Sequence, residues 1–471
     1  MNKKDLNWYL KTIGEAGDEL DVEIYAVGGF VRDMLLKKET DEVDFVVRGD
    51  SIEVARRACE RVKGHGYVEY SKFKTASFVT DLFKFEFVSA RSESYKEDSR
   101  KPVVTSATLE EDLLRRDFTV NALAMGVNKS NFGKVLDPLG GRNDIEARLI
   151  KTPLDPYETF SEDPLRIMRA ARFAGRLDFI IEQEALTAME AEKERLNIVS
   201  KERISDELMK ILSQTKPSEG LRILKHTGVL SVIFPEIDNM AGVEQRDEYH
   251  HKDVFEHTLT VVDNVAAQTD QLKLRLAALV HDIGKPPVKK FIKGKGWTFH
   301  GHEFIGEKVF SSICRRLRLS RKVCAYCLKM IRLHMRPIQL VGEEVTDSAI
   351  RRLLVQAGDD IEDLMLLCRA DITSGNPRRV KQYLANFDHV ATRMEEVEEK
   401  DRMRAFQSPV RGDEIMEICG LEPGPLVGKI KHRIEEAILE GEIPNDYEAA
   451  LRYLKKIKEE ENSLSQERNS Q

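Results

Sequence analysis

The pattern of hydrophobic and polar residues changes once along the 471-residue chain, near Pro153. Before this point, short apolar runs alternate with polar and helical stretches, as expected for strands separated by helices. The expected strands are Ile24–Val27, Val43–Val47, Ala76–Thr80 and Lys84–Val88. After this point, apolar residues recur with the helical period. The pattern therefore predicts an α+β head followed by an all-helical body.

The length indicates more than one domain. At about 150 residues per domain, 471 residues are enough for about three compact domains. An apolar fraction of 41% and a charged fraction of 33% are typical of a globular, helix-rich chain. We expect a head over 1–150, a helical neck over 151–240, a third domain over 241–400 and a helical C-terminal segment with a tail over 401–471.

Net charge and cysteine content favour some classes of protein over others. The net charge of −7 argues against non-specific coating of nucleic acid, so an RNA partner would need a local basic surface. The six cysteines are scattered, and the lone CxxC of Cys324 and Cys327 lies in a helical stretch, which favours a packing role. No signal-like N-terminus is present, and no stretch approaches the roughly 18 apolar residues of a membrane span. We expect a cytoplasmic protein without a membrane partner.

A double-glycine turn carries the clearest chemistry. Residues 25–47 read YAVGGFVRDMLLKKETDEVDFVV, a strand, a turn, a helix start and a second strand. Gly28 and Gly29 have no Cβ, so their backbone amides can approach a triphosphate near the positive end of a helix. Glu42 and Asp44 lie two apart on a strand, so both carboxylates share one face and can hold Mg²⁺ against nucleotide phosphates. A solvated acidic strand beside an ordinary turn is the alternative interpretation.

A second cluster in the head, residues 115–123, reads RRDFTVNAL. The guanidinium groups of Arg115 and Arg116 suit triphosphate oxygens, and Asp117 could accept a hydrogen bond from a ribose hydroxyl. Out of context, such a cluster is more often a salt-bridged helix start.

A third cluster, residues 161–173, reads SEDPLRIMRAARF. We expect Ser161 to cap this helix, with Pro164 in its first turn. Asp163 and Arg166 would then share a face, either as a mutual ion pair or as an acceptor and donors that read a base edge.

These clusters together resemble the polymerase-β-like nucleotidyltransferases, and among them the class II tRNA CCA-adding enzymes and bacterial poly(A) polymerases. The family motifs are GG-x-VRD followed by Asp-x-Asp, then RRDFT-x-NA and ED-x-x-R. The resemblance implies a head with a mixed sheet and helices that adds CTP and ATP to the 3′ end of tRNA with Mg²⁺. It implies Glu42 and Asp44 as catalytic metal ligands, Asp163 and Arg166 as a protein template, and nucleotide contacts by Gly28, Gly29, Arg32, Arg116, Asp117, Asp163, Arg166 and Arg169.

The chain departs from this family at the first carboxylate, which is Glu42 instead of Asp. The extra methylene moves the carboxylate oxygens by roughly an ångström, and Mg²⁺ demands near-octahedral geometry, so we expect an effect on activity. Asp41 cannot replace it, since a residue three positions from Asp44 points to the other face of a strand. Lys37 stands where the family has Gly. Glu86 is a candidate third carboxylate, with an edge-strand glutamate as the alternative.

Three connecting segments have expected structural roles. The charged stretch Ala90–Leu114 is typical of a flap over an active site. The segment 136–141 resembles the hinge between head and neck, and Gly140-Gly141 is a credible turn. Residues 200–208 resemble a helix that braces the neck against the template helix.

Histidines indicate a second site, because seven of the eleven fall between His250 and His334. His281 and Asp282 end an apolar helix before a Gly-Lys-Pro break, where adjacent His and Asp can bind a cation. This order resembles the HD phosphohydrolase superfamily, which implies a divalent metal such as Mn²⁺ or Ni²⁺ and a phosphatase or phosphodiesterase reaction on cyclic phosphates or damaged 3′ ends. The implied ligands are His257, His281, Asp282 and Asp371, with His302 and His334 for a second ion.

The C-terminal part also resembles tRNA nucleotidyltransferases with an inserted HD domain. Residues 412–416, Gly428-Lys429 and the basic run 431–433 could contact RNA backbone, or the segment is a plain amphipathic helix pair. Three other functions stay open: a poly(A) polymerase or an enzyme adding only A or only CC, an HD phosphohydrolase with a silenced transferase head, and a pure RNA-binding module.

Overall fold

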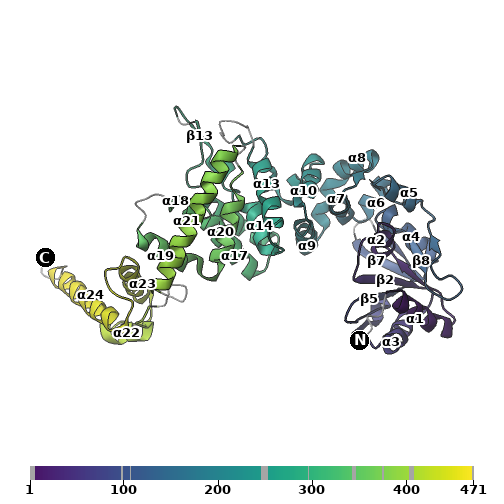
Figure 1. Cartoon of the computed structure of the whole chain (residues 1–471), viewed down its shortest axis with the longest axis horizontal. Helices are drawn as coiled ribbons and strands as arrows, with labels where there is room; N and C mark the ends of the chain where they lie inside the picture. Colours follow the sequence, from purple (N-terminus) through teal and green to yellow (C-terminus); the bar gives the residue numbers. More distant parts are fainter. Residues whose placement is uncertain are drawn as a thin grey trace. The chain divides into compact units, whose positions relative to one another are not determined.

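The computed structural model describes residues 6–96, 99–106, 108–244, 253–294, 296–341, 346–373, 376–401 and 408–468 (Figure 1). The chain forms two compact units, Met1–Asp238 and Asn239–Gln471. The first unit contains the mixed sheet, and the second is built almost entirely of helices.

The elements of the head lie in the first unit. They are α1 (Leu6–Glu19), β1 (Ile24–Val27), α2 (Gly29–Leu35), β2 (Glu42–Val47), α3 (Ser51–Val62), β3 (His65–Tyr70), η1 (Ser71–Phe73), β4 (Thr75–Val79), β5 (Lys84–Ser89), β6 (Arg91–Lys96), β7 (Ser99–Ser106), α4 (Leu109–Leu114), η2 (Thr119–Asn121), β8 (Ala124–Gly126), β9 (Val135–Leu136), α5 (Gly141–Glu146) and β10 (Leu149–Ile150).

The head is organised around a mixed sheet with the strand order β3-β4-β5-β2-β1-β8-β9. β2 and β5 run parallel, and the other neighbouring strands run antiparallel. The inward positions of β2, β4 and β5 are filled by four buried phenylalanines whose rings contact one another, and α3 packs against β4 and β5. Along β2 and β5 these apolar positions alternate with polar ones. The polar side chains of both strands therefore lie together on the face of the sheet opposite the phenylalanine rings. The rings are Phe45, Phe78, Phe85 and Phe87.

The four expected strands are present, with ends that differ by one residue at β2, β4 and β5. Strands β3, β8 and β9 were not predicted, because β3 is exposed along most of its length and β8 and β9 are too short to show a period. The expected flap contains the antiparallel hairpin β6–β7 and α4. At the expected hinge, Gly140 has a φ of +73° just before α5. Glu86 is not on an edge strand, because β5 lies between β4 and β2.

The neck follows within the same unit. It comprises α6 (Pro156–Glu162), α7 (Leu165–Leu177), β11 (Ile180–Ile181), α8 (Gln183–Glu192), η3 (Lys193–Ile198), α9 (Lys201–Leu212), α10 (Pro217–His226), α11 (Val229–Ile233) and α12 (Pro235–Asp238).

The start of the α7 helix differs from the sequence prediction. Ser161 belongs to α6 instead of capping α7, and Pro164 occupies the N-cap position. Asp163 supplies the cap, since its carboxylate accepts a hydrogen bond from the Leu165 amide at 3.3 Å. The expected bracing contact is present, because α9 packs against α7 and Arg172 donates to the buried Glu207 at 2.7 Å.

The second unit contains α13 (Val254–Ala266), α14 (Leu272–Val280), α15 (Lys285–Val288), β12 (Lys290–Ile292), β13 (Gly296–Thr298), α16 (His302–Arg316), α17 (Arg321–Leu333), α18 (Arg336–Gln339), α19 (Asp347–Ala357), η4 (Gly358–Asp360), α20 (Ile361–Ala370), α21 (Pro377–Asp401), α22 (Gly412–Cys419), α23 (Pro425–Leu439) and α24 (Tyr447–Arg468). The α+β prediction is confirmed, although the body also contains the hairpin β12–β13.

The core of the second unit is the apolar helix α14, which contacts α13, α17 and α20 (Figure 1). Seven of its residues are buried, as expected for a helix that is apolar on nearly all sides. Cys324 and Cys327 lie in α17 as free thiols, and Cys327 is buried, in line with a packing role. None of the helices in the described ranges is both long and apolar enough to cross a bilayer.

The C-terminal helices α22, α23 and α24 pack around a small apolar core that includes Ile415, Ile434 and Leu454. On α23, the basic residues Lys429, Lys431, His432 and Arg433 are exposed, whereas Ile430 and Ile434 between and after them are buried. The amphipathic interpretation is therefore confirmed for this helix, and RNA contact by its basic face stays a prediction.

Candidate functional site

The double-glycine turn lies beside the carboxylates because of strand register. β1 ends at Val27, which pairs with Asp44 on β2, so the turn that follows β1 begins next to this carboxylate. Gly28 occupies the N-cap of α2 with φ +69° and ψ −133°, and its amide donates to the Leu123 carbonyl at 3.1 Å. Residues with a side chain rarely adopt this backbone conformation, which explains why position 28 is a glycine.

Three carboxylates converge next to this turn. Glu42, Asp44 and Glu86 each place an oxygen within 4.8 Å of the others. Asp44 and Glu86 are direct partners in the parallel β2–β5 pairing, so their side chains leave the same face of the sheet. Glu86, which the sequence indicated only as a candidate third carboxylate, therefore belongs to the cluster. Glu42 also reaches the cluster, although its side chain is one methylene longer than that of Asp.

Electrostatic repulsion makes this cluster a candidate cation site. Burial, and then the neighbouring charges of Glu86 and Glu42, raise the pKa of Asp44 to about 6. One cation does contact the group, since Lys84 lies 2.5 Å from Glu42, but Lys84 is half exposed. Three hard carboxylate ligands that repel one another fit a divalent cation such as Mg²⁺.

Arg116 lies above the glycine turn. A Cβ added to Gly28 would lie 2.8 Å from the Arg116 guanidinium. The guanidinium also contacts the Asp112 carboxylate at 3.3 Å, while its Nε is buried with no hydrogen-bond partner in the described structure. A buried donor without a partner is costly, so this nitrogen is suited to an anionic ligand such as a phosphate.

Replacing Gly28 by Ala tests this close approach. We expect a loss of folding stability of about 1–3 kcal/mol from the backbone conformation alone. For the nucleotidyl transfer that the family resemblance implies, we expect a loss of roughly 10- to 100-fold, because the added methyl displaces Arg116. Thermal unfolding and tRNA extension measure the two effects.

Gly133→Ala is the matched control for that substitution. Gly133 has a φ of +75°, but an added Cβ there would meet no atom within 4 Å. It should therefore lower stability with little loss of transfer. Equal loss of transfer in both variants would contradict the role of Arg116.

Arg32, an expected nucleotide contact, is buried inside the head. It is only 1% exposed, and its guanidinium donates to Asp33 at 2.8 Å and to Asn121 at 2.5 Å. Direct phosphate contact would break both bonds in a buried place. The Arg32 side chain ties α2 to the motif around Asn121, and its contact with a nucleotide stays a prediction.

Asp117 is also fully engaged. Its carboxylate accepts from the Phe118 amide at 2.9 Å, from Asn121 at 3.0 Å and from Arg169 at 2.8 and 2.5 Å. Burial alone would raise the pKa of Asp117, but Arg169 and Asn121 outweigh it and hold the pKa below its usual value. The expected pair of nucleotide contacts, Asp117 and Arg169, thus forms a buried link between the head motif and α7.

The two expected template residues, Asp163 and Arg166, lie at the start of α7. The Arg166 guanidinium donates to the Arg115 carbonyl at 2.6 Å, and the Asp163 carboxylate lies 3.4 Å from the Arg203 guanidinium. The mutual ion pair between Asp163 and Arg166 that the sequence allowed is therefore not needed, because each side chain contacts a different residue. Arg166 therefore lies next to the 115–117 motif, and Asp163 lies just before the same helix on the side of α9.

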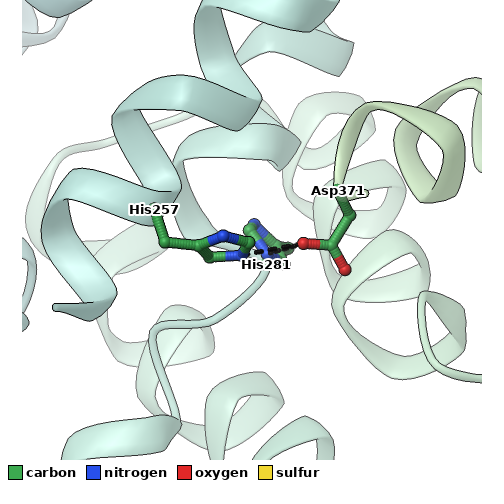
Figure 2. Close-up of side chains that lie close together, drawn as sticks. All are labelled: His257, His281 and Asp371. Carbon is green, nitrogen blue, oxygen red and sulfur yellow. Dashed lines mark ion pairs between the residues drawn. The ribbon is translucent and has the colours of Figure 1, made fainter. Parts of the chain in front are cut away.

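A second group of ligands lies in the second unit. Figure 2 shows His257, His281 and Asp371 pointing toward one another from α13 and from the ends of α14 and α20. The Nε2 atoms of His257 and His281 lie 2.8 and 3.4 Å from one Asp371 oxygen.

Asp282 joins this trio to two further histidines. Its Oδ2 lies 3.5 Å from His257 and 3.2 Å from His281, and its Oδ1 lies 3.5 Å from His302 and 3.8 Å from His334. The two possible cation groups are thus His257, His281 and Asp371, and Asp282, His302 and His334. A carboxylate with one oxygen toward each group can bridge two ions.

The ring orientation of the histidines is fixed by their outer nitrogens. In His281, His302 and His334, Nδ1 lies 2.8–2.9 Å from a backbone carbonyl, and in His257 it lies 2.8 Å from the Thr373 hydroxyl. An Nδ1–H that donates to a carbonyl leaves the lone pair on Nε2, which points into the centre. This arrangement is typical of metal-binding histidines.

Two buried atoms lack hydrogen bonds at the centre of the group. His281 Nε2 and Asp282 Oδ2 are 3.2 Å apart without hydrogen-bond geometry, and the nearest cation to Asp282 Oδ2 is the Lys285 ammonium at 2.6 Å. Burial opposes the charged imidazole, but Asp282 and Asp371 outweigh it and raise the pKa of His281 to about 10. Imidazole and carboxylate ligands that converge without satisfying each other fit divalent transition metals.

Two residues near these sites were missed from the sequence. Lys84 pairs with Glu42 from the neighbouring strand, and only the β2–β5 register reveals this. Lys285 lies 2.6 Å from the Asp282 carboxylate, and its position three residues after Asp282 in a helical turn was an available signal.

Comparisons with known families agree with this layout. The sequence matches the family models described as poly A polymerase head domain over residues 24–151, probable RNA and SrmB-binding site of polymerase A over 178–240, and HD domain over 254–375.

Curated relatives match over most of their length. The multifunctional CCA protein of Nitrosococcus oceani is 35% identical over 364 residues, covering 74% of this chain and 84% of that protein. The protein of the same name from Cupriavidus metallidurans is 32% identical over 363 residues, with the same coverage.

Solved structures have the same fold. A CCA-adding enzyme in its apo form II covers 96% of both chains with a TM-score of 0.62 at 23% identity. A tRNA nucleotidyltransferase complexed with a primer tRNA and an incoming ATP analog matches with a TM-score of 0.57 at 25% identity, over 81% of this chain and 99% of that one.

Proposed function

This chain belongs to the CCA-adding tRNA nucleotidyltransferase family, the family of the multifunctional CCA proteins, and on that basis we propose that its head adds C, C and A to the 3′ end of tRNA. The substrates are tRNA, CTP and ATP, the head uses Mg²⁺, and the protein acts in the cytoplasm. The observation that carries the proposal is the convergence of Glu42, Asp44 and Glu86 beside Gly28 and Arg116.

The side chains of the head have separate tasks in this reaction. Glu42, Asp44 and Glu86 would hold Mg²⁺, which, when bound, neutralises phosphate charge and favours attack by the tRNA 3′-hydroxyl. Arg116 attracts the triphosphate through the nitrogen that has no protein partner. Asp163 and Arg166 face the base and select it by hydrogen bonding, while Arg169 and Asp117 keep α7 against the head.

A primer-extension assay tests the proposal and its rivals. A tRNA that lacks its 3′ CCA is incubated with CTP alone, ATP alone or both, and the products are sequenced. We expect CC from CTP and CCA from both. Long A tails would favour a poly(A) polymerase, and addition of only A or only CC would favour a partial enzyme.

The same assay decides whether Glu42 silences the head. Extension by the unaltered protein would exclude a silenced transferase. A protein that is nearly inactive as it stands, and becomes active as Glu42→Asp, would instead favour a chain that is chiefly an HD phosphohydrolase.

We also propose that the HD centre hydrolyses phosphoesters, because two Asp and four His side chains converge there and His281 Nε2 is buried among them without a hydrogen bond. Mn²⁺ or Ni²⁺ suits these ligands and, when bound, makes water a strong nucleophile. Lys285, beside Asp282, is positioned to meet the anionic substrate. Release of nucleoside monophosphate from a 2′,3′-cyclic nucleotide tests this activity, and no release with either metal would rule it out.

Magnesium binding to the head should depend on pH. Since the pKa of Asp44 is raised to about 6, this carboxyl is mostly neutral below pH 6 and charged above it. Mg²⁺ must then displace a proton at low pH, so its affinity should fall up to about tenfold per pH unit below 6 and level off above 7. Calorimetry with Mg²⁺ and ATP between pH 5 and 8 measures this, and a flat profile would contradict it.

A further inference from the structure

The hairpin β12–β13 has an unusual composition and lies beside the HD centre. Of the 20 residues between Asp282 and Glu303, five are lysines and none is acidic, in a chain with a net charge of −7. The hairpin therefore concentrates positive charge in the stretch that joins two metal ligands, Asp282 and His302.

One face of the hairpin combines aromatic rings and a cation. Phe291 and Trp297 are direct cross-strand partners, with ring centroids 5.2 Å apart at 75°. The Lys289 ammonium lies 4.2 Å from the Trp297 ring centroid. Phe291 is 65% exposed, which leaves much of its ring open to a ligand.

The lysines of the hairpin are not neutralised. Within the described structure, no carboxylate lies within ion-pair distance of Lys289, Lys290 or Lys293. Lys290 and Lys293 are exposed. This surface therefore has charge available for an anionic partner, beside an open aromatic ring.

The residues that flank the hairpin contact the metal centre directly. The Phe299 carbonyl, just after β13, lies 2.9 Å from Nδ1 of the ligand His302. The Lys285 ammonium lies 2.6 Å from Asp282 and 5.6 Å from the Phe299 ring centroid. The residues on either side of the hairpin therefore contact two of the metal ligands, which places a ligand on the hairpin close to the centre in the chain.

We propose that the hairpin β12–β13 binds single-stranded RNA and delivers its 3′-terminal phosphate to the HD centre. This inference rests on the proposed hydrolase function and names its substrate as an oligonucleotide end instead of a free nucleotide. A base stacks on Phe291, and Lys289, Lys290 and Lys293 contact successive phosphates. Aromatic rings with neighbouring lysines are the usual means of holding single strands without sequence preference.

The two tryptophans of the chain provide a binding assay that is independent of hydrolysis. The chain contains only Trp8 and Trp297, so in a Trp8→Phe background the fluorescence reports on the hairpin alone. The probe is an eight-residue oligoribonucleotide that ends in a 2′,3′-cyclic phosphate. We expect saturable quenching of Trp297, and about tenfold weaker binding in Phe291→Ala. Lys289→Ala should reduce the salt dependence of binding by about 0.7 in log–log slope.

A matched control and a small substrate make the assay specific. Phe73 is 59% exposed in the head, so Phe73→Ala removes a comparable ring elsewhere and should leave quenching unchanged. With the loaded enzyme, Phe291→Ala should lower kcat/KM for the oligonucleotide about tenfold relative to kcat/KM for 2′,3′-cyclic AMP, which is too small to span the hairpin.

The outcomes separate the two proposals. Absence of quenching, or quenching that Phe291→Ala does not weaken, would overturn the RNA-binding surface even if cyclic AMP is hydrolysed. Quenching without hydrolysis under Mn²⁺ or Ni²⁺ would keep the surface and reject the hydrolase function. Equal quenching by a polyglutamate peptide would assign the surface to an acidic protein instead of RNA.

Discussion

Replacing Asp44 by Asn should lower the rate of nucleotidyl transfer at least about 10³-fold, because loss of a shared metal ligand removes several kcal/mol of transition-state stabilisation. The fold should survive. Burial and the charges of Glu86 and Glu42 raise the pKa of Asp44, so its ionised form opposes folding at neutral pH, and the neutral amide removes this repulsion. We expect a melting temperature without Mg²⁺ that is equal to or higher than that of the unaltered protein.

The control for this substitution is Asp41→Asn. It makes the same chemical change three residues away, at an exposed position outside the carboxylate cluster. It should transfer nucleotides at nearly the normal rate. A comparable loss in both variants, or normal transfer by Asp44→Asn, would show that β2 does not carry the metal site.

Replacing Asp282 by Asn should abolish metal binding at the HD centre and lower phosphoester hydrolysis at least about 10³-fold. Of the two carboxylates among the six described ligands, only Asp282 lies within ion-pair distance of both groups of histidines. Burial opposes its charge, but His281 and Lys285 outweigh burial and hold the pKa of Asp282 well below its usual value. The metal content of the purified protein, measured by mass spectrometry, should fall from two ions per chain to below one.

Asp371→Asn provides a graded comparison. Asp371 contacts His257 and His281 but belongs to only one of the two groups, so this variant should keep one ion. The thermal unfolding of both variants is also measured, so that a loss of metal caused by misfolding can be recognised. Replacement of the exposed His300 by Ala should leave the metal content unchanged. Two ions retained by Asp282→Asn would contradict the bridging geometry.

The order of the strands in the head was beyond what the sequence pattern could predict. The alternation in FKFEFVS indicates β5 as a strand, but nothing local says that it pairs in parallel with β2. That pairing brings Glu86 opposite Asp44, and therefore it decides the number of carboxylates at the site. The short strands β8 and β9 form only because β1 and the Gly126 region lie next to each other in the fold.

The candidate ligands were easier to predict than their partners. The four HD residues and both extra histidines could be found from their order in the sequence, and all six converge. The proposal that Asp282 bridges two ions depends on where each carboxylate oxygen points, which spacing does not reveal. Arg32 stays a predicted nucleotide contact from its place in a motif, and the structure adds two buried partners that the sequence did not reveal, Asp33 and Asn121.

The buried bond between Arg169 and Asp117 has a consequence for protein engineering. A chimaera joined near residue 150 would take these two partners from different parents. If the donor neck lacked an arginine at 169, the carboxylate of Asp117 would stay buried with one fewer partner, at a cost of several kcal/mol. Exchange of base preference between related enzymes should therefore succeed more often when the junction moves both residues together.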